Sequence, residues 1–178
     1  GESLESVNGN QLGDVYLTAD DGANLDGRIV VVNRLGTERD GEMFSLSRDR
    51  IVSGAATTLV SPKGFDVADE AGLLLITDNG DPAVKVFGAQ SGADAPPLFT
   101  APLAVAPWDL DYDPDSDQLF VALTDGTVAV FDSYSTARGS AGPDRIITPA
   151  EAGVAFAAPT NLHGIVYVAE TDQLILSD

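Results

Sequence analysis

The 178 residues contain no cysteine, so disulfide bridges and thiolate metal sites cannot form and the redox compartment stays open. The one histidine, His163, excludes a metal site made of several imidazoles and a catalytic pair of histidines. No apolar run reaches the length of about 18 residues that a membrane-spanning helix needs. Neither a Gly-x-Ser-x-Gly elbow nor a phosphate-binding loop with lysine is present. The common signs of nucleophilic and phosphoryl-transfer catalysis are therefore missing.

Basic residues are scarce: 9 Lys and Arg stand against 28 Asp and Glu, for a net charge of −19, and the only lysines are Lys63 and Lys85. Such a surface repels phosphate, which argues against nucleic acid and anionic membranes as partners. High-salt solubility, bound calcium or an ordinary acidic surface could each produce this balance. We favour a halophilic origin because the acids are spread along the whole chain. Residues 1–6 resemble a processed start, and we expect a secreted, periplasmic or cell-surface protein.

Short apolar runs bounded by Gly, Pro, Asp and Asn predict β-strands rather than helices. Three hairpins are predicted, which pair residues 15–18 with 28–32, 73–76 with 84–87, and 119–123 with 127–131. The last of these has Asp125-Gly126 at its turn, where glycine accepts a positive φ. More polar outer strands are predicted at residues 49–52, 97–100 and 144–147.

Prolines open a repeated unit at Pro62, Pro107 and Pro159, with spacings of 45 and 52 residues. Each unit reads as four strands, and such a sheet cannot bury both of its faces alone. Four-stranded units with a period of about 40–50 residues are typical of β-propeller blades, which stack face to face. The sequence therefore predicts an all-β fold, a β-propeller of four-stranded antiparallel blades.

Three segments resemble the repeats of the NHL and YVTN group of propellers: Arg50–Gly54, Pro62–Val67 and Leu74–Asp78. The third unit departs from that pattern, since Asp109 replaces the glycine after the proline. The resemblance runs from about Gly13 onward. It implies a propeller of six or seven blades but no particular activity, because these propellers host many functions.

We expect residues 1–12 to be an N-terminal extension and residues 13–178 to form the propeller. The blade units are placed near residues 13–61, 62–106, 107–158 and 159–178, the last of them incomplete. This makes about 3.5 blades, fewer than the resemblance implies. The expected molecule is a partial propeller, which further sequence or a second chain would complete.

Aspartates alternate along one stretch of the third unit, at Asp109, Asp111, Asp113, Asp115 and Asp117. Oxygen ligands at every second position can wrap a hard cation such as Ca²⁺. An EF-hand is excluded, because Ser116 and Ala122 stand where that loop needs Gly and Glu. Asp109, Asp111, Asp113 and Asp117 are the predicted metal ligands, with calcium as the one candidate cofactor. The alternative is an inner strand followed by a solvated turn.

Asp66, Asp111 and His163 each lie four residues after a unit's proline. The resemblance allows such residues to converge on a central cation, as in metal-dependent propeller lactonases, or to line a polar channel. Two functions follow. We favour a non-catalytic module that binds a protein, peptide or small-molecule ligand through its loops. The alternative is a metal-dependent hydrolase or lactonase whose site is shared with further blades.

Overall fold

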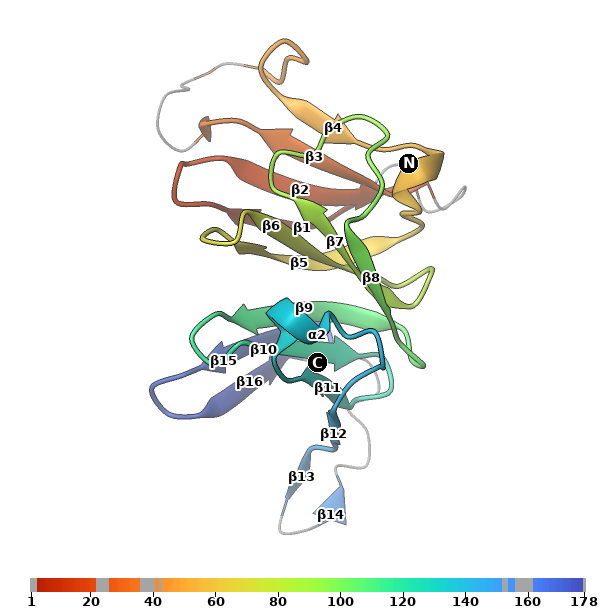
Figure 1. Cartoon of the computed structure of the whole chain (residues 1–178), viewed down its shortest axis with the longest axis vertical. Coiled ribbons are helices and arrows are strands. Elements are labelled where there is room, and N and C mark those ends of the chain that lie inside the picture. Colours follow the sequence, from red (N-terminus) through yellow and green to blue (C-terminus); the bar gives the residue numbers. More distant parts are fainter. Residues whose placement is uncertain are drawn as a thin grey trace.

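The computed structural model describes residues 3–21, 26–35, 41, 43–151, 154–155 and 162–177, and the regular secondary structure in these ranges is almost entirely β-strand (Figure 1). The strands are β1 (Ser3–Gly9), β2 (Val15–Asp20), β3 (Arg28–Val32), β4 (Arg50–Val52), β5 (Pro62–Ala68), β6 (Leu73–Asp78), β7 (Ala83–Gly88), β8 (Phe99–Pro102), β9 (Pro107–Asp113), β10 (Gln118–Leu123), β11 (Val128–Phe131), β12 (Arg145–Ile147), β13 (Ala150–Glu151), β14 (Val154–Ala155), β15 (Gly164–Val168) and β16 (Gln173–Ser177). The described residues also form a 3₁₀ turn, η1 (Ala55–Thr57), and a one-turn helix, α2 (Tyr134–Ala137). None of the helices in these ranges is long and apolar enough to cross a membrane.

The strands form antiparallel sheets in chain order. We call β1–β4 blade 1, β5–β8 blade 2, β9–β12 blade 3 and the two-stranded sheet β15–β16 blade 4, while β13 and β14 form a separate hairpin. The first strands of the blades, β1, β5, β9 and β15, lie side by side. Antiparallel sheets that stack with their first strands adjacent are the arrangement of a β-propeller, so the predicted fold is confirmed.

The prolines mark blade starts as predicted. β5 begins at Pro62 and β9 at Pro107, where a residue without an N–H can open a strand. Pro159 lies outside the described residues, and β15 begins at Gly164. The strands predicted to precede each proline are present as β4, β8 and β12.

The first blade begins earlier in the chain than the expected boundary at residue 13. Ser3–Gly9 forms β1 and pairs with β2 from Ser3↔Asp20 to Gly9↔Val15, with a bulge between Leu4 and Ser6. Residues 1–12 were expected to be an extension because this strand has neither the proline nor a run of apolar residues. Its place in the sheet comes from backbone pairing with β2.

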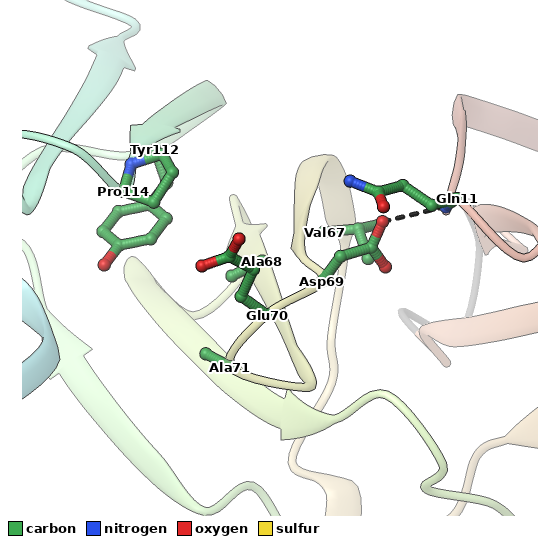
Figure 2. Close-up of a pocket in the computed structure, with 8 residues that line it drawn as sticks. All are labelled: Gln11, Val67, Ala68, Asp69, Glu70, Ala71, Tyr112 and Pro114. Atoms are coloured by element: carbon green, nitrogen blue, oxygen red, sulfur yellow. Dashed lines mark hydrogen bonds between the residues drawn. The ribbon is translucent and has the colours of Figure 1, made fainter.

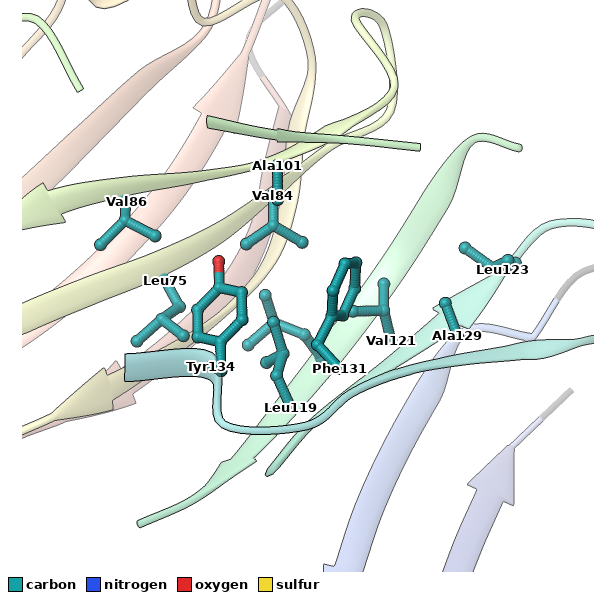
Figure 3. Close-up of a cluster of buried hydrophobic side chains, with 11 residues drawn as sticks. Leu75, Val84, Val86, Ala101, Leu119, Val121, Leu123, Ala129, Phe131 and Tyr134 are labelled. Carbon is teal, nitrogen blue, oxygen red and sulfur yellow. The ribbon is translucent and has the colours of Figure 1, made fainter. Parts of the chain in front are cut away.

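Among the described residues, three hydrophobic clusters lie between consecutive blades. Tyr16 and Phe65 belong to the cluster between blades 1 and 2, and Leu162 to the one between blades 3 and 4. The cluster between blades 2 and 3 is the largest and centres on Phe131 and Tyr134 (Figure 3). Stacking of the blades therefore builds the core, as the repeat requires.

Polar groups also join the blades. The Thr18 hydroxyl of blade 1 donates to the Lys63 carbonyl of blade 2 at 2.5 Å. The Thr77 hydroxyl of blade 2 donates to the Trp108 carbonyl of blade 3 at 2.8 Å. The two bonds occupy equivalent places, since Lys63 and Trp108 each follow the proline that opens a first strand.

A buried ion pair fixes the connection between blades 1 and 2. Lys85 Nζ lies 2.8 Å from Asp78 Oδ2 and contacts the Thr58 carbonyl oxygen. Asp78 also accepts hydrogen bonds from the backbone N–H groups of Val60, at 2.8 Å, and Ser61, at 2.9 Å. Strands β6 and β7 thus hold the segment that leads into their own blade.

Candidate functional site

Asp109 and Asp111 lie on β9 and bind the backbone of the next blade. Asp109 Oδ2 accepts from the Ile165 N–H at 3.2 Å, and Asp111 Oδ2 accepts from the Tyr167 N–H at 2.7 Å. Asp66 on β5 does the same one blade earlier, where its Oδ2 accepts from Tyr112 at 3.1 Å. We call these contacts carboxylate bridges, because each ties two neighbouring first strands together.

Gly64 explains why the repeat has glycine at one place and aspartate at the next. A Cβ atom on Gly64 would lie 1.9 Å from Asp109 Oδ1 and 2.6 Å from the Asp109 Cα atom. The absence of a side chain in blade 2 therefore leaves room for the Asp109 carboxylate of blade 3. The departure from the repeat pattern at Asp109 is thus accommodated by glycine in the preceding blade.

Asp113 and Asp117 belong to the turn between β9 and β10. Asp113 accepts from the backbone N–H groups of Asp115, at 3.3 Å, and Ser116, at 3.1 Å, which is an Asx turn. Asp117 has φ 54° and occupies the left-handed position that Gly13 and Gly72 hold in earlier blades. Its Oδ1 accepts from the Ser135 N–H and from the Tyr112 hydroxyl, both at 2.9 Å.

These contacts correspond to the alternative of an inner strand and a turn. Across the ranges that the structure describes, no group of three or more His, Asp or Glu side chains is placed to hold a metal ion. The calcium site at Asp109, Asp111, Asp113 and Asp117 stays a prediction. His163 does not share the place of Asp66 and Asp111, although all three follow a proline by four residues. It lies beside Trp108 instead.

Burial raises the pKa of Asp109 to about 6, and the charges of Asp111 and Asp66 act in the same direction. Hydrogen bonds from the backbone of Leu110 and Ile165 oppose the shift. Burial also raises the pKa of Asp111. The first strands thus carry carboxyl groups that hold their protons more tightly than free aspartate does.

We expect Asp109→Asn to stabilise the protein at pH 8 and to have little effect at pH 4. The folded-state pKa of Asp109, about 6, exceeds the ordinary value of 3.8. The proton on the Asp109 carboxyl group therefore contributes its full stabilisation to the wild type below about pH 4, and this contribution is lost as the pH rises through about 6. Asparagine cannot ionise and can still accept from Ile165. The expected gain at pH 8 is about 1–3 kcal/mol, measured by urea unfolding at both pH values.

Asp115→Asn is the control, because it removes an exposed carboxylate from the adjacent turn. It should change the unfolding free energy little at either pH. An Asp109→Asn variant that is less stable than wild type at pH 8 would contradict the claim that burying the Asp109 charge destabilises the folded protein.

A cavity of about 470 Å³ lies where the turns of blades 1, 2 and 3 meet (Figure 2). Its lining residues are Gln11, Val67, Ala68, Asp69, Glu70, Ala71, Tyr112 and Pro114. The Gln11 N–H donates to Asp69 Oδ2 at 2.8 Å and so joins the blade 1 turn to the blade 2 turn. Figure 2 shows the Glu70 carboxylate between Asp69 on one side and the Tyr112 ring on the other.

The predicted site residues do not include those of this cavity, which among the described residues is lined by two carboxylates and by no basic residue. A signal was available. Each first strand of the repeat ends in a turn, and the turns of neighbouring blades must lie close together when first strands are adjacent. Residues 69–71 and Pro114 could therefore have been predicted to lie close together.

At the other end of the first strands, Lys63, Trp108 and His163 form a row across blades 2, 3 and 4. The Trp108 ring stacks on His163, with centroids 4.5 Å apart, and Lys63 Nζ lies 5.4 Å from the Trp108 centroid. Lys63 also pairs with Glu5 at 3.2 Å and Asp20 at 3.0 Å. Both lysines of the chain thus neutralise carboxylates inside the fold.

No protein-family profile matches the sequence, and no curated protein is significantly similar to it. Among solved structures, the chain is similar to one described as Kluyveromyces lactis Hsv2 complete loop 6CD, with a TM-score of 0.49 and 13% sequence identity. The alignment covers 98% of this chain and 59% of that one. A likeness at this level carries no argument about function. The assignment to the β-propeller fold rests on the sheet order and stacking described above.

Proposed function

We propose that this chain is a non-catalytic β-propeller module that binds a protein or peptide ligand at the cavity between the turns of blades 1, 2 and 3. The observation that carries the proposal is the convergence of three separate turns on one cavity of about 470 Å³. In a propeller, the turns between strands lie on the two open faces of the ring of blades. A partner that binds there can contact several blades at once. Loops on a rigid scaffold are the usual place for binding residues.

The chemistry of the lining favours a cationic group. Asp69 and Glu70 supply carboxylates, and Asp69 already accepts from Gln11. Glu70 is exposed, and the neighbouring Tyr112 ring offers a face on which an ammonium or guanidinium group can rest. The net charge of −19 attracts basic ligands over longer distances. An arginine or lysine side chain of a peptide meets these conditions.

Further parts of the proposal rest on the sequence. The blade period and the prolines at the starts of β5 and β9 support a relation to the NHL and YVTN propellers. The abundance of acidic residues supports adaptation to high salt. A secreted, periplasmic or cell-surface location is also part of the proposal.

We expect a tetra-arginine peptide to bind wild type and to lose affinity when Glu70 is replaced by glutamine. An exposed charge pair contributes about 0.2–1 kcal/mol, so Glu70→Gln should weaken binding by about 1.4-fold to fivefold in calorimetric titrations. Tetraglutamate should not bind.

The matched control is Glu170→Gln, which removes the same charge from the equivalent turn of blade 4, between β15 and β16. Because Glu170 does not line the cavity, this variant should bind as wild type does. Equal weakening by both substitutions would show that the peptide follows net charge alone, and the site would be rejected.

A further inference from the structure

Blades 2 and 3 are both four-stranded, and strand pairing identifies equivalent positions on their second and third strands. The proline that opens the first strand pairs with Asp78 in blade 2 and with Leu123 in blade 3, so these two residues are equivalent. The residue two places before each of them pairs with Lys85 in blade 2 and with Ala129 in blade 3. Where blade 2 has its buried ion pair, blade 3 therefore has a leucine and an alanine.

The connections that enter the two blades are equivalent as well. The N–H of the residue after the second strand donates to the Ser61 carbonyl in blade 2 and to the Ala106 carbonyl in blade 3, both at 2.9 Å. In blade 2, Lys85 extends from the third strand and contacts the Thr58 carbonyl oxygen of this connection. The alanine of blade 3 is too short to reach the corresponding connection, residues 103–106. It therefore cannot fill the space that the lysine fills in blade 2.

A cavity of about 270 Å³ lies at this place in blade 3, and we call it the blade 2–3 cavity. Six of its lining residues are apolar and two are polar: Leu103, Ala104, Val105, Leu123, Pro143 and Ile146, with Asp125 and Thr127. Leu123 is 2% exposed and lies at the end of the buried cluster away from Tyr134 (Figure 3). Ile146 is 53% exposed. The cavity thus runs from the core between two blades to the surface.

A carboxylate from the turn between the second and third strands is common to both blades. In blade 2 it is Asp81, whose Oδ2 lies 2.8 Å from Lys85 Nζ. In blade 3 it is Asp125, which is exposed and lines the cavity. The Thr127 N–H, at 3.0 Å, and the Thr127 hydroxyl, at 2.7 Å, both donate to Asp125 Oδ1, so Oδ2 can still bind a cation. Blade 3 therefore has the turn carboxylate of this arrangement without the lysine.

We propose that the blade 2–3 cavity binds a small primary alkylammonium compound, which takes the place that the lysine side chain has in blade 2. Its ammonium group pairs with Asp125, and its apolar body lies against Leu103, Val105 and Ile146. Burial of the apolar body drives binding, and the carboxylate sets the orientation. Ligand pockets usually measure about 300–1,000 Å³, so a cavity of about 270 Å³ suits a ligand with few heavy atoms. This site is separate from the cavity lined by Glu70.

A series of n-alkylammonium ions of increasing length tests the proposal on the wild-type chain. Binding is followed by two-dimensional NMR, through the backbone amide signals of residues 103–105 and 125–127. Each buried methylene group should improve affinity about fourfold, so n-hexylammonium should bind about 15-fold more tightly than n-butylammonium. Hexanoate has a similar body and the opposite charge, and it should leave these signals unchanged. An affinity that is independent of chain length would mean that the ions only follow the net charge of −19, and it would overturn the proposal.

Ala104→Trp should block the blade 2–3 cavity from its outer side. Ala104 is exposed, so the variant should fold, and it should no longer show the hexylammonium-dependent shifts of residues 125–127. Ala169→Trp adds the same ring to an exposed turn residue of blade 4 that does not line the cavity, and it should bind as wild type does. Binding that survives Ala104→Trp would overturn the proposal.

The role of Asp125 has its own test. An exposed charge pair is worth little, so Asp125→Asn should weaken hexylammonium binding by about 1.4-fold to fivefold. Glu70→Gln removes a charge from the other cavity and should leave this binding unchanged. Unchanged binding by Asp125→Asn, or equal weakening by Glu70→Gln, would overturn the proposal, and neither result would bear on the peptide site at Glu70.

Discussion

Replacing Lys85 with methionine is expected to lower the free energy of unfolding by about 3–5 kcal/mol, the cost of removing one partner from a buried ion pair. The side chain of Lys85 is 1% exposed and that of Asp78 is 0% exposed. Methionine preserves most of the side-chain volume, so the loss comes from leaving the Asp78 carboxylate buried without its cation. Urea unfolding at neutral pH measures the change.

Arg145→Met is the matched control. Arg145 pairs with Asp132, but the two side chains are 49% and 38% exposed, so water can replace the lost partner. This substitution should cost at most about 1 kcal/mol. If Lys85→Met cost no more than Arg145→Met, the pair with Asp78 would not be what fixes the connection between blades 1 and 2.

Phe131→Ala should cost about 3–5 kcal/mol, because truncating a buried aromatic side chain loses its transfer free energy and leaves a cavity. Phe131 ends β11 and meets Tyr134 edge to face, with ring centroids 5.7 Å apart. The same cluster contains Leu75 and Val84 of blade 2, so the cavity would lie between two blades (Figure 3). Chemical denaturation followed by tyrosine and tryptophan fluorescence gives the loss.

Ile146→Ala tests the same blade without opening the interface, because Ile146 lies on β12 and is 53% exposed. It should cost less than about 1 kcal/mol. A second readout is the number of transitions. If the cluster couples blades 2 and 3, the variant should still unfold in one step at a lower urea concentration. Separate unfolding of the two blades in the wild type would contradict that coupling.

Strands with local signals could be placed from the sequence. The predicted segment 28–32 is β3, and the remaining hairpin strands were placed to within two residues. Apolar runs and turn residues act over a few positions, so periodicity and turn chemistry are enough to locate such strands. β1 has neither signal, and only its pairing with β2 places it.

The candidate site could not be predicted from the repeat, because it depends on contacts between residues that lie far apart in the sequence. The aspartates of β9 and its turn were chosen for their alternation, which a strand and a hard-cation loop share. Their hydrogen bonds run to Ile165, Tyr167 and Ser135, far along the chain. Glu70, by contrast, has no unusual sequence context and became a candidate only when three turns met around it.

The carboxylate bridges show that part of the acidic composition has a structural role between blades. Of the 28 acidic residues, 21 are aspartates, and in the described part of the chain Asp66, Asp109 and Asp111 each hold a backbone N–H of the next blade. These contacts depend on the reach of a side chain with a single methylene group. Glutamate would keep the charge but carry it past the neighbouring strand. At these positions the length of the side chain decides the contact, so part of the acidic composition serves contacts between blades inside the fold.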